Sequence, residues 1–253
     1  MTAITAGCRI CAPEAKLVRF VICSVQDATL VQKQSLGGVP YTTLFRGGND
    51  GHIKCLRALV EHGGNVNARR STNNRTPLHY AIERELWDGY STIVYILLAA
   101  RADPNARDNA GDTPLLMLLV GMGKLPQERR NALYLLLAPN FDTKLDIRFP
   151  STLDNPLHLA IRRKDAYVVD AILQRIQFLK GDSMSLMHDQ NASGFTPILL
   201  ALSIFKMTSD DAAEDFHIVK LLLDHGANPD DQTPRSRIRR STMSSANIKT
   251  VQR

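Results

Sequence analysis

The chain has 253 residues, 44% of them hydrophobic and 22% charged, and a formal net charge of +6. This composition is typical of a folded protein and excludes a wholly disordered chain. No apolar run reaches the roughly 18 to 20 residues that a membrane helix needs, so the sequence predicts no spanning segment.

Residues 1–41 carry no clear motif, although residues 14–25 are predicted to form one apolar helix. Charged residues interrupt that stretch, which argues against a signal peptide and favours a cytoplasmic or nuclear protein. Cys8 and Cys11 form a single C-x-x-C pair, but no second ligand pair or βαβ pattern accompanies it. We therefore expect reduced thiols and no metal site.

From residue 42 onward, one short motif recurs. A degenerate copy begins at Thr42, and four clearer copies follow: Thr76-Pro77-Leu78-His79, Thr113-Pro114-Leu115-Leu116, Asn155-Pro156-Leu157-His158 and Thr196-Pro197-Ile198-Leu199. Apolar residues at helical spacing then predict a second helix in the copies at 42, 76, 155 and 196. Each of these copies is therefore expected to be a helix pair.

The residues of the motif have mechanical roles. Thr or Asn caps the first helix, because its side-chain oxygen accepts from a backbone N–H that would lack a partner. Pro fits the first helical position, because its ring presets φ and no hydrogen bond is lost there. Gly63 and Gly226 are predicted to end second helices in the left-handed conformation.

The motif and its period resemble those of ankyrin repeats, which recur about every 33 residues with a T-P-L-H-x-A core. The resemblance implies an all-α solenoid of helix pairs joined by β-turn fingers. The predicted parts are a degenerate N-terminal cap at 1–41, repeats at 42–75, 76–112, 113–154, 155–195 and 196–234, and a basic tail at 235–253.

Uneven spacing between copies indicates insertions at helix turns, where repeats tolerate them. The copies at 76, 113 and 196 carry about four, six and nine extra residues between their helices, whereas the copy at 155 lengthens after its second helix.

The resemblance also implies that a protein partner contacts the finger tips and the exposed side of the first helices. The candidate partner-binding residues at those positions are Arg69, Arg75, Arg84, Trp87, Arg107, Asn109, Asp112, Arg162, Arg163 and Phe195. Because arginine binds carboxylate or phosphate through two N–H groups, the pattern favours an acidic or phosphorylated partner segment. The alternatives are solvated arginines without a partner and a Trp87 that covers the helices beneath it.

The tail, residues 235–253, holds six basic residues and no acid, whereas residues 1–234 are formally neutral. Nucleic-acid binding or contact with an import receptor is therefore an alternative function of the tail alone. The tail lacks the interleaved aromatic residues that stack on bases.

No set of residues suggests catalysis, a cofactor or a small-molecule substrate, and no phosphate-binding loop or nucleophile motif is present. The histidines at 79 and 158 belong to the repeat motif, where the resemblance implies a bond to the finger backbone. The sequence therefore predicts a non-enzymatic scaffold or adaptor.

Overall fold

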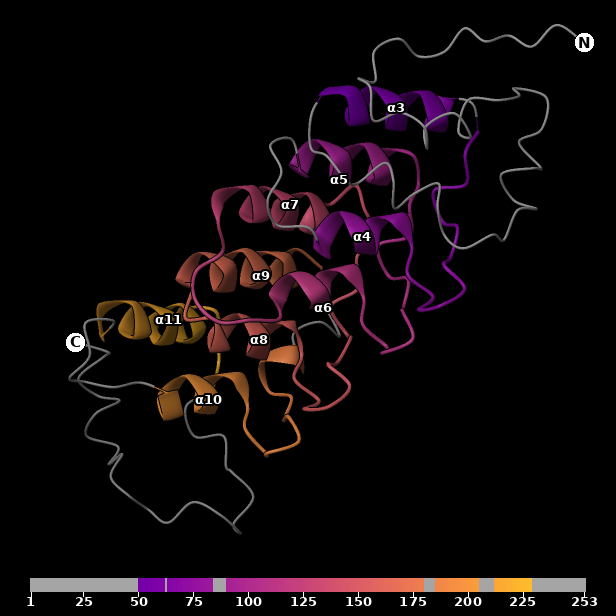
Figure 1. The fold of residues 1–253 in the computed structure, drawn as a ribbon. Helices are drawn as coiled ribbons and strands as arrows, with labels where there is room; N and C mark the ends of the chain where they lie inside the picture. Colours follow the sequence, from indigo (N-terminus) through magenta and orange to yellow (C-terminus); the bar gives the residue numbers. More distant parts are fainter. Residues whose placement is uncertain (1–49, 62, 84–89, 180–184, 205–211, 229–253) are drawn as a thin grey trace, which may run out of the picture. The chain divides into compact units, whose positions relative to one another are not determined.

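The computed structural model describes residues 50–61, 63–83, 90–179, 185–204 and 212–228 (Figure 1). These residues form α-helices joined by turns and hairpin-like loops, and they include no β-strand. The all-α prediction is therefore confirmed. Some predicted features lie outside the described residues: the helix at 14–25, the C-x-x-C pair, Arg84, Trp87 and the basic tail.

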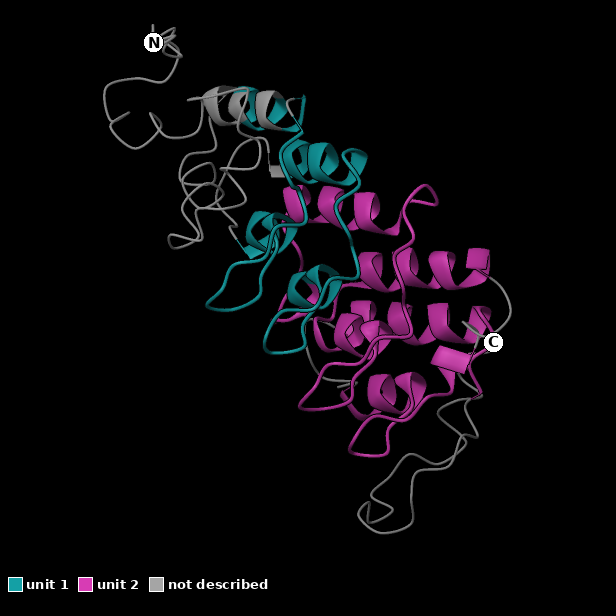
Figure 2. Cartoon of the chain, turned by 90° about the vertical axis from the view of Figure 1, so that its right-hand side faces the viewer, with its two compact units in different colours: residues 1–118 teal, residues 119–253 magenta. Residues whose placement is uncertain are grey.

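The chain divides into two compact units, residues 1–118 and 119–253 (Figure 2). The first contains α3 (Asp50–Glu61), α4 (Pro77–Glu83) and α5 (Tyr90–Ala99), and α6 (Pro114–Leu119) ends at the boundary. The second contains α7 (Gln127–Leu137), α8 (Pro156–Arg162), α9 (Ala166–Leu179), α10 (Pro197–Ile204) and α11 (Ala212–Asp224).

Within each unit, helices pack both inside a repeat and between neighbouring repeats. In the first unit, α5 contacts α3 and α4. In the second, α8 packs on α9 and α10 on α11, while α8 contacts α10 and α9 contacts both α7 and α11. Figure 1 shows α7, α9 and α11 in one layer of this unit and α8 and α10 in the other. Each helix pair therefore buries its apolar side against its neighbours, as in a repeat array.

The ends of the helices agree with the local prediction. Proline is the first residue of α4, α6, α8 and α10, where it costs no hydrogen bond. Gly63 and Gly226 have φ of +77° and +90°, as expected after a second helix. At the corresponding place after α5, Arg101 has φ of +65°, and the next N–H donates to the carbonyl of Leu97.

Most of the apolar stripe of each second helix is buried, and so are the small alanines Ala81 and Ala160 of the first helices. The buried stripe residues include Ile93, Val94, Leu97, Leu98, Val168, Val169, Ile172, Leu173, Ile218, Val219 and Leu222.

The insertion between α6 and α7 agrees with the sequence, whereas the placement of the extra residues of the copy at 155 after its second helix is wrong, because α9 itself continues to Leu179. Residues 120–126 separate α6 from α7, whereas only residues 163–165 separate α8 from α9. The insertions expected in the copies at 76 and 196 fall on residues 84–89 and 205–211, which lie outside the described residues.

Candidate partner-binding face

His79 fastens the first helix of its repeat to the finger that follows. Its Nδ1 accepts from the backbone N–H of Thr76 at 3.2 Å and lies 2.8 Å from the Thr76 hydroxyl. The proton of the neutral ring therefore belongs on Nε2, which is 3.2 Å from the carbonyl oxygen of Asp112. Burial lowers the pKa of His79, which favours this neutral form.

In the copy at 155, His158 makes a similar link, but the contact at Nδ1 differs, because this atom lies 2.8 Å from the Oδ1 atom of Asn155. The Asn155 Oδ1 atom accepts from the backbone N–H of His158 at 3.0 Å, and its amide donates to the carbonyl of Leu186 at 2.8 Å. Nε2 of His158 lies 2.8 Å from the carbonyl oxygen of Phe195, which closes the next finger. Burial lowers the pKa of His158 as well.

The remaining two copies have leucine in place of histidine. Thr113 still caps α6, because its hydroxyl oxygen accepts from the N–H of Leu116 at 3.3 Å. The buried hydroxyl of Thr196 has no hydrogen-bond partner among the described residues. A leucine side chain has no hydrogen-bond donor, so Leu116 and Leu199 form no side-chain bond to a finger carbonyl. These two copies therefore lack the link that histidine makes between the first helix and the next finger.

Neighbouring fingers are joined by backbone hydrogen bonds and, in the first unit, also by the side chain of Asn74. In the first unit, the N–H of Asn109 donates to the carbonyl of Asn73 at 2.9 Å, and the Asn74 amide donates to the carbonyl of Arg107 at 3.3 Å. In the second unit, the N–H of Ala192 donates to the carbonyl of Thr152 at 2.8 Å. These bonds hold the tips of adjacent fingers in register.

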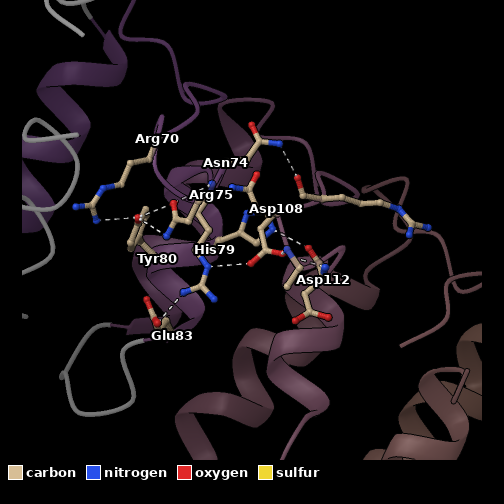
Figure 3. A network of polar contacts seen from close by, with 12 residues as sticks. Arg70, Asn74, Arg75, His79, Tyr80, Glu83, Asp108 and Asp112 are labelled. Carbon is tan, nitrogen blue, oxygen red and sulfur yellow. Dashed lines mark hydrogen bonds and ion pairs between the residues drawn. The ribbon is translucent and has the colours of Figure 1, made fainter. Parts of the chain in front are cut away.

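Arg75 lies between two carboxylates of its own chain (Figure 3). Its guanidinium contacts Glu83 at 2.7 Å and Asp108 at 2.9 Å. Although burial opposes the shift, the bonds to Asp108 and Glu83 raise the pKa of Arg75. Hydrogen bonds from Arg75 and from two backbone N–H groups likewise hold the pKa of Asp108 below its ordinary value, against the effect of burial. The charge of Arg75 is thus already compensated by two carboxylates of its own chain.

Arg69 and Arg107 are exposed on adjacent fingers. One nitrogen of Arg69, Nη1, donates to the carbonyls of Arg107 at 2.8 Å and Asn74 at 3.3 Å. Neither guanidinium forms an ion pair with a carboxylate among the described residues. Asn109 beside them is exposed, and Asp112 is half-buried, where burial and the nearby Asp108 raise its pKa.

The exposed position predicted for Arg163 is wrong. Arg163 is only 5% exposed, and its Nη1 donates to the carbonyls of Val120 at 3.0 Å and Leu119 at 3.4 Å. A guanidinium that satisfies the last carbonyls of α6 in this way supports the α6–α7 loop from beneath. Arg162 is half-exposed, but it pairs with the buried Asp154 at 2.9 Å. Phe195 is half-buried.

Family models for ankyrin repeats match residues 10–108, described as three copies, and residues 193–234, described as one repeat. Together they span more than half of the chain. The chain belongs to the ankyrin-repeat family. The first match begins inside the segment that the sequence predicted to be a degenerate cap.

The solved structure of EF0377, an ankyrin repeat protein, has a TM-score of 0.59 and 21% identity, and the alignment covers 83% of this chain and 92% of that one. The fold is therefore an all-α ankyrin-repeat solenoid.

Two curated relatives are also similar. The Drosophila melanogaster NF-kappa-B inhibitor cactus is 61% identical over 33 residues, 13% of this chain and 7% of that protein. Mouse protein phosphatase 1 regulatory subunit 27 is 36% identical over 64 residues, 25% and 38% respectively. The chain thus matches less than half the length of either relative.

Sequence reasoning missed two polar residues of the ankyrin fingers, Arg148 and Asp154. Asp154 accepts from Thr152, Arg162 and Asn191, and Arg148 pairs with Asp189 at 2.8 Å. The sequence contained a signal for such finger residues. Asp108 lies five residues before Thr113-Pro114, and Asn191 lies five residues before Thr196-Pro197, so the two residues hold the same position in their fingers. The pairing of each side chain depends on the neighbouring finger, which the sequence pattern of one repeat does not show.

The described residues contain neither a candidate metal site nor a candidate membrane span. No group of His, Cys, Asp or Glu side chains in this part of the chain has a geometry that could hold a metal ion. None of the helices that the structure describes is long and apolar enough to cross a membrane.

Proposed function

We propose that this ankyrin-repeat chain is a non-enzymatic scaffold or adaptor that holds a protein partner against its fingers and first helices. Arg69 and Arg107 engage an acidic or phosphorylated segment of that partner. The proposal rests on one observation, which is that some arginines of the fingers and first helices pair with carboxylates and others do not. Arg75 and Arg162 pair with carboxylates of the chain itself, whereas Arg69 and Arg107 are exposed and form no such pair among the described residues.

The geometry of Arg69 supports binding. Its Nη1 atom is held by two carbonyl oxygens, so much of the freedom of this long side chain is already lost before a partner arrives. Binding then costs less conformational entropy, and Arg69 as a whole is exposed. A carboxylate or phosphate accepts from such a planar fork through two oxygens.

The relatives support the general class of function. One is named as an inhibitor of NF-kappa-B and another as a regulatory subunit of a phosphatase. Both names describe proteins that act on other proteins. The aligned part is too short to carry their partners over to this chain, so the partner is proposed by chemistry alone.

The test begins with the full chain as bait. The protein that it retains from a lysate is identified, purified and titrated against three chains. These are the wild type, the double variant Arg69→Glu/Arg107→Glu and the control Lys54→Glu/Arg57→Glu. The control makes the same change in charge at exposed positions of α3, away from the fingers.

Loss of two charge-assisted contacts should weaken binding about tenfold to a hundredfold. The control should bind like the wild type. Equal weakening by both variants would mean that only the overall charge matters, and no effect of the finger variant would reject the proposed face. Phosphatase treatment of the partner distinguishes the sources of negative charge, since only a phosphorylated segment loses affinity.

A cytoplasmic or nuclear location and a role of residues 235–253 in nuclear import or nucleic-acid binding remain proposals from the sequence. Deletion of residues 235–253 tests the tail. If the tail contacts nucleic acid, the full chain shifts an oligonucleotide in a salt-dependent way and the deletion abolishes the shift.

A further inference from the structure

A threonine hydroxyl follows two arginines at the tip of one finger of the first unit. Residues 69–72 read Arg-Arg-Ser-Thr, so Thr72 has arginine both two and three residues before it. Many serine/threonine kinases select their acceptor by such a pair, because carboxylates of the kinase bind the two guanidinium groups. The sequence around Thr72 therefore has the pattern of a kinase acceptor.

Thr72 is accessible to another protein. Its side chain is exposed, and its hydroxyl forms no hydrogen bond among the described residues, so none has to be broken. Behind it, the N–H of Arg70 donates to the carbonyl of Arg75 at 3.0 Å, and the N–H of Asn74 donates to the carbonyl of Arg70 at 2.8 Å. Loop tips held by so few bonds open locally at little cost in free energy, which lets a kinase bind the segment extended.

A hydroxyl in the second unit gives a contrast. Ser151 is also exposed and has Arg148 three residues before it, but Arg148 pairs with Asp189 at 2.8 Å. Arg69 and Arg70 form no ion pair with a carboxylate in the part of the chain that the structure describes, and Arg70 donates instead to a neutral tyrosine hydroxyl at 3.0 Å. The charges that a kinase would recognise are thus already compensated at one hydroxyl and uncompensated at the other.

The next finger of the first unit brings a further arginine to the same tip. Nη1 of Arg69 donates to the carbonyl of Arg107 at 2.8 Å. The N–H of Asn109 donates to the carbonyl of Asn73 at 2.9 Å, and its side-chain amide donates to the carbonyl of Thr72 at 3.3 Å. Thr72, Arg69 and Arg107 therefore lie on the joined tips of adjacent fingers.

We propose that Thr72 is a phosphorylation site of an arginine-selecting serine/threonine kinase, and that its phosphate compensates the charges of Arg69 and Arg107 and releases an acidic partner. The kinase transfers the γ-phosphoryl group of ATP. The bond from the Thr72 oxygen to phosphorus forms, the bond from that phosphorus to ADP breaks, and the hydroxyl proton passes to the catalytic carboxylate of the kinase. The release of the partner rests on the proposed function, whereas the modification itself does not.

The charge of the phosphate suits this role. A phosphothreonine carries about −1.5 to −2 charges at pH 7 and has three acceptor oxygens. These charges match the two positive charges of Arg69 and Arg107. Because the phosphate is attached to the finger, it competes with the carboxylates or phosphates of a partner at a high effective concentration. The partner then meets a surface without net positive charge.

The first experiment locates the modification. The full chain is incubated with ATP and a purified kinase that selects arginine two and three residues before its acceptor, and modified residues are identified by peptide mass spectrometry. A synthetic peptide of residues 66–75 is the standard. Phosphate should appear at Thr72 in the wild type and in Ser71→Ala, and be absent in Thr72→Val. Modification of neither the peptide nor the chain, or of the peptide alone, overturns the inference.

Phosphorus NMR then tests whether the phosphate meets the arginines. The chain carries Thr242→Ala, because residues 239–242 repeat the tetrapeptide of residues 69–72. The pKa of the second phosphate ionisation, about 6 in an isolated phosphothreonine, should be lower in the folded chain than in the peptide by about 0.3 to 0.5.

Arg107→Gln should remove this difference, since it keeps the backbone carbonyl that binds Arg69 and deletes only the charge. Arg57→Gln, at an exposed position of α3, is the control and should keep the difference. The same pKa in chain and peptide would mean that the phosphate does not meet Arg107, and this overturns the inference.

The purified partner that the full chain retains completes the test. Phosphorylation of Thr72 should weaken its binding at least tenfold, and kinase-treated Thr72→Val should bind like the untreated chain. When Arg69→Glu/Arg107→Glu weakens binding and the phosphate does not, the inference is overturned and the proposed function stands. When neither weakens binding but the pKa of the phosphate is lowered, the proposed function fails and Thr72 remains a phosphorylation site.

Discussion

Replacement of His79 by leucine tests whether a buried neutral imidazole links helix to finger. His79 is fully buried and contacts the Thr76 N–H, the Thr76 hydroxyl and the Asp112 carbonyl. Leucine keeps the bulk but leaves the Asp112 carbonyl without that donor. A buried polar group without a partner costs about 1 to 3 kcal/mol, so His79→Leu should lower the free energy of unfolding by about that amount at pH 7.5.

The pH dependence gives a second, independent number. Burial lowers the pKa of His79 in the folded state, so below about pH 6.5 the unfolded chain binds a proton that the folded chain does not. The stability due to the neutral ring is therefore complete above the unfolded pKa and is lost as the pH falls towards the folded pKa. The slope approaches about 1.4 kcal/mol per pH unit for one histidine.

His79→Leu removes this slope, so the stability deficit of the variant should shrink by up to about 1 kcal/mol between pH 7.5 and 5.5. Urea unfolding followed by circular dichroism at pH 7.5, 6.5 and 5.5 measures it. Ser71→Ala, at an exposed position of the preceding finger, changes no titratable group, serves as the control and should keep the wild-type pH dependence. A deficit that stays constant or grows in acid would refute the reasoning, because it would mean that the folded chain retains a protonated His79.

Three further substitutions test local features by the same unfolding assay. Thr113→Val should lower the free energy of unfolding by about 1 kcal/mol, because it removes the hydroxyl that accepts from the N–H of Leu116. Thr196→Val should be neutral or stabilising, because the Thr196 hydroxyl is buried without a partner among the described residues. Equal losses in the two variants would contradict this. Gly121→Ala should cost about 1 to 3 kcal/mol, because Gly121 has φ of +127° and a Cβ atom there would lie 2.8 Å from Nη1 of Arg163; an unchanged midpoint would show that the loop is not held against Arg163.

Much of the fold follows from the sequence because its signals are local. A Thr or Asn before Pro caps and starts a first helix, and this requires only the next few residues. The stripes at Ile93–Leu98 and Val168–Leu173 predict buried helices, because the period of 3.6 residues places them on one face. The recurrence of the motif then indicates the family, and the loop before α7 appears in the spacing between copies.

The candidate site depends on contacts between residues far apart in the chain, which is why the sequence could name its elements but not the state of its side chains. Arg75, Arg107 and Arg163 are alike in the sequence, yet one pairs with Asp108, one is exposed and one is buried under the α6–α7 loop. Whether the charge of a guanidinium is compensated is decided by the carboxylates that the neighbouring repeat brings within about 3 Å of it, and whether it is exposed is decided by the packing around it. The sequence by itself determined a repeat array, and only its tertiary packing decided which charges the array leaves uncompensated.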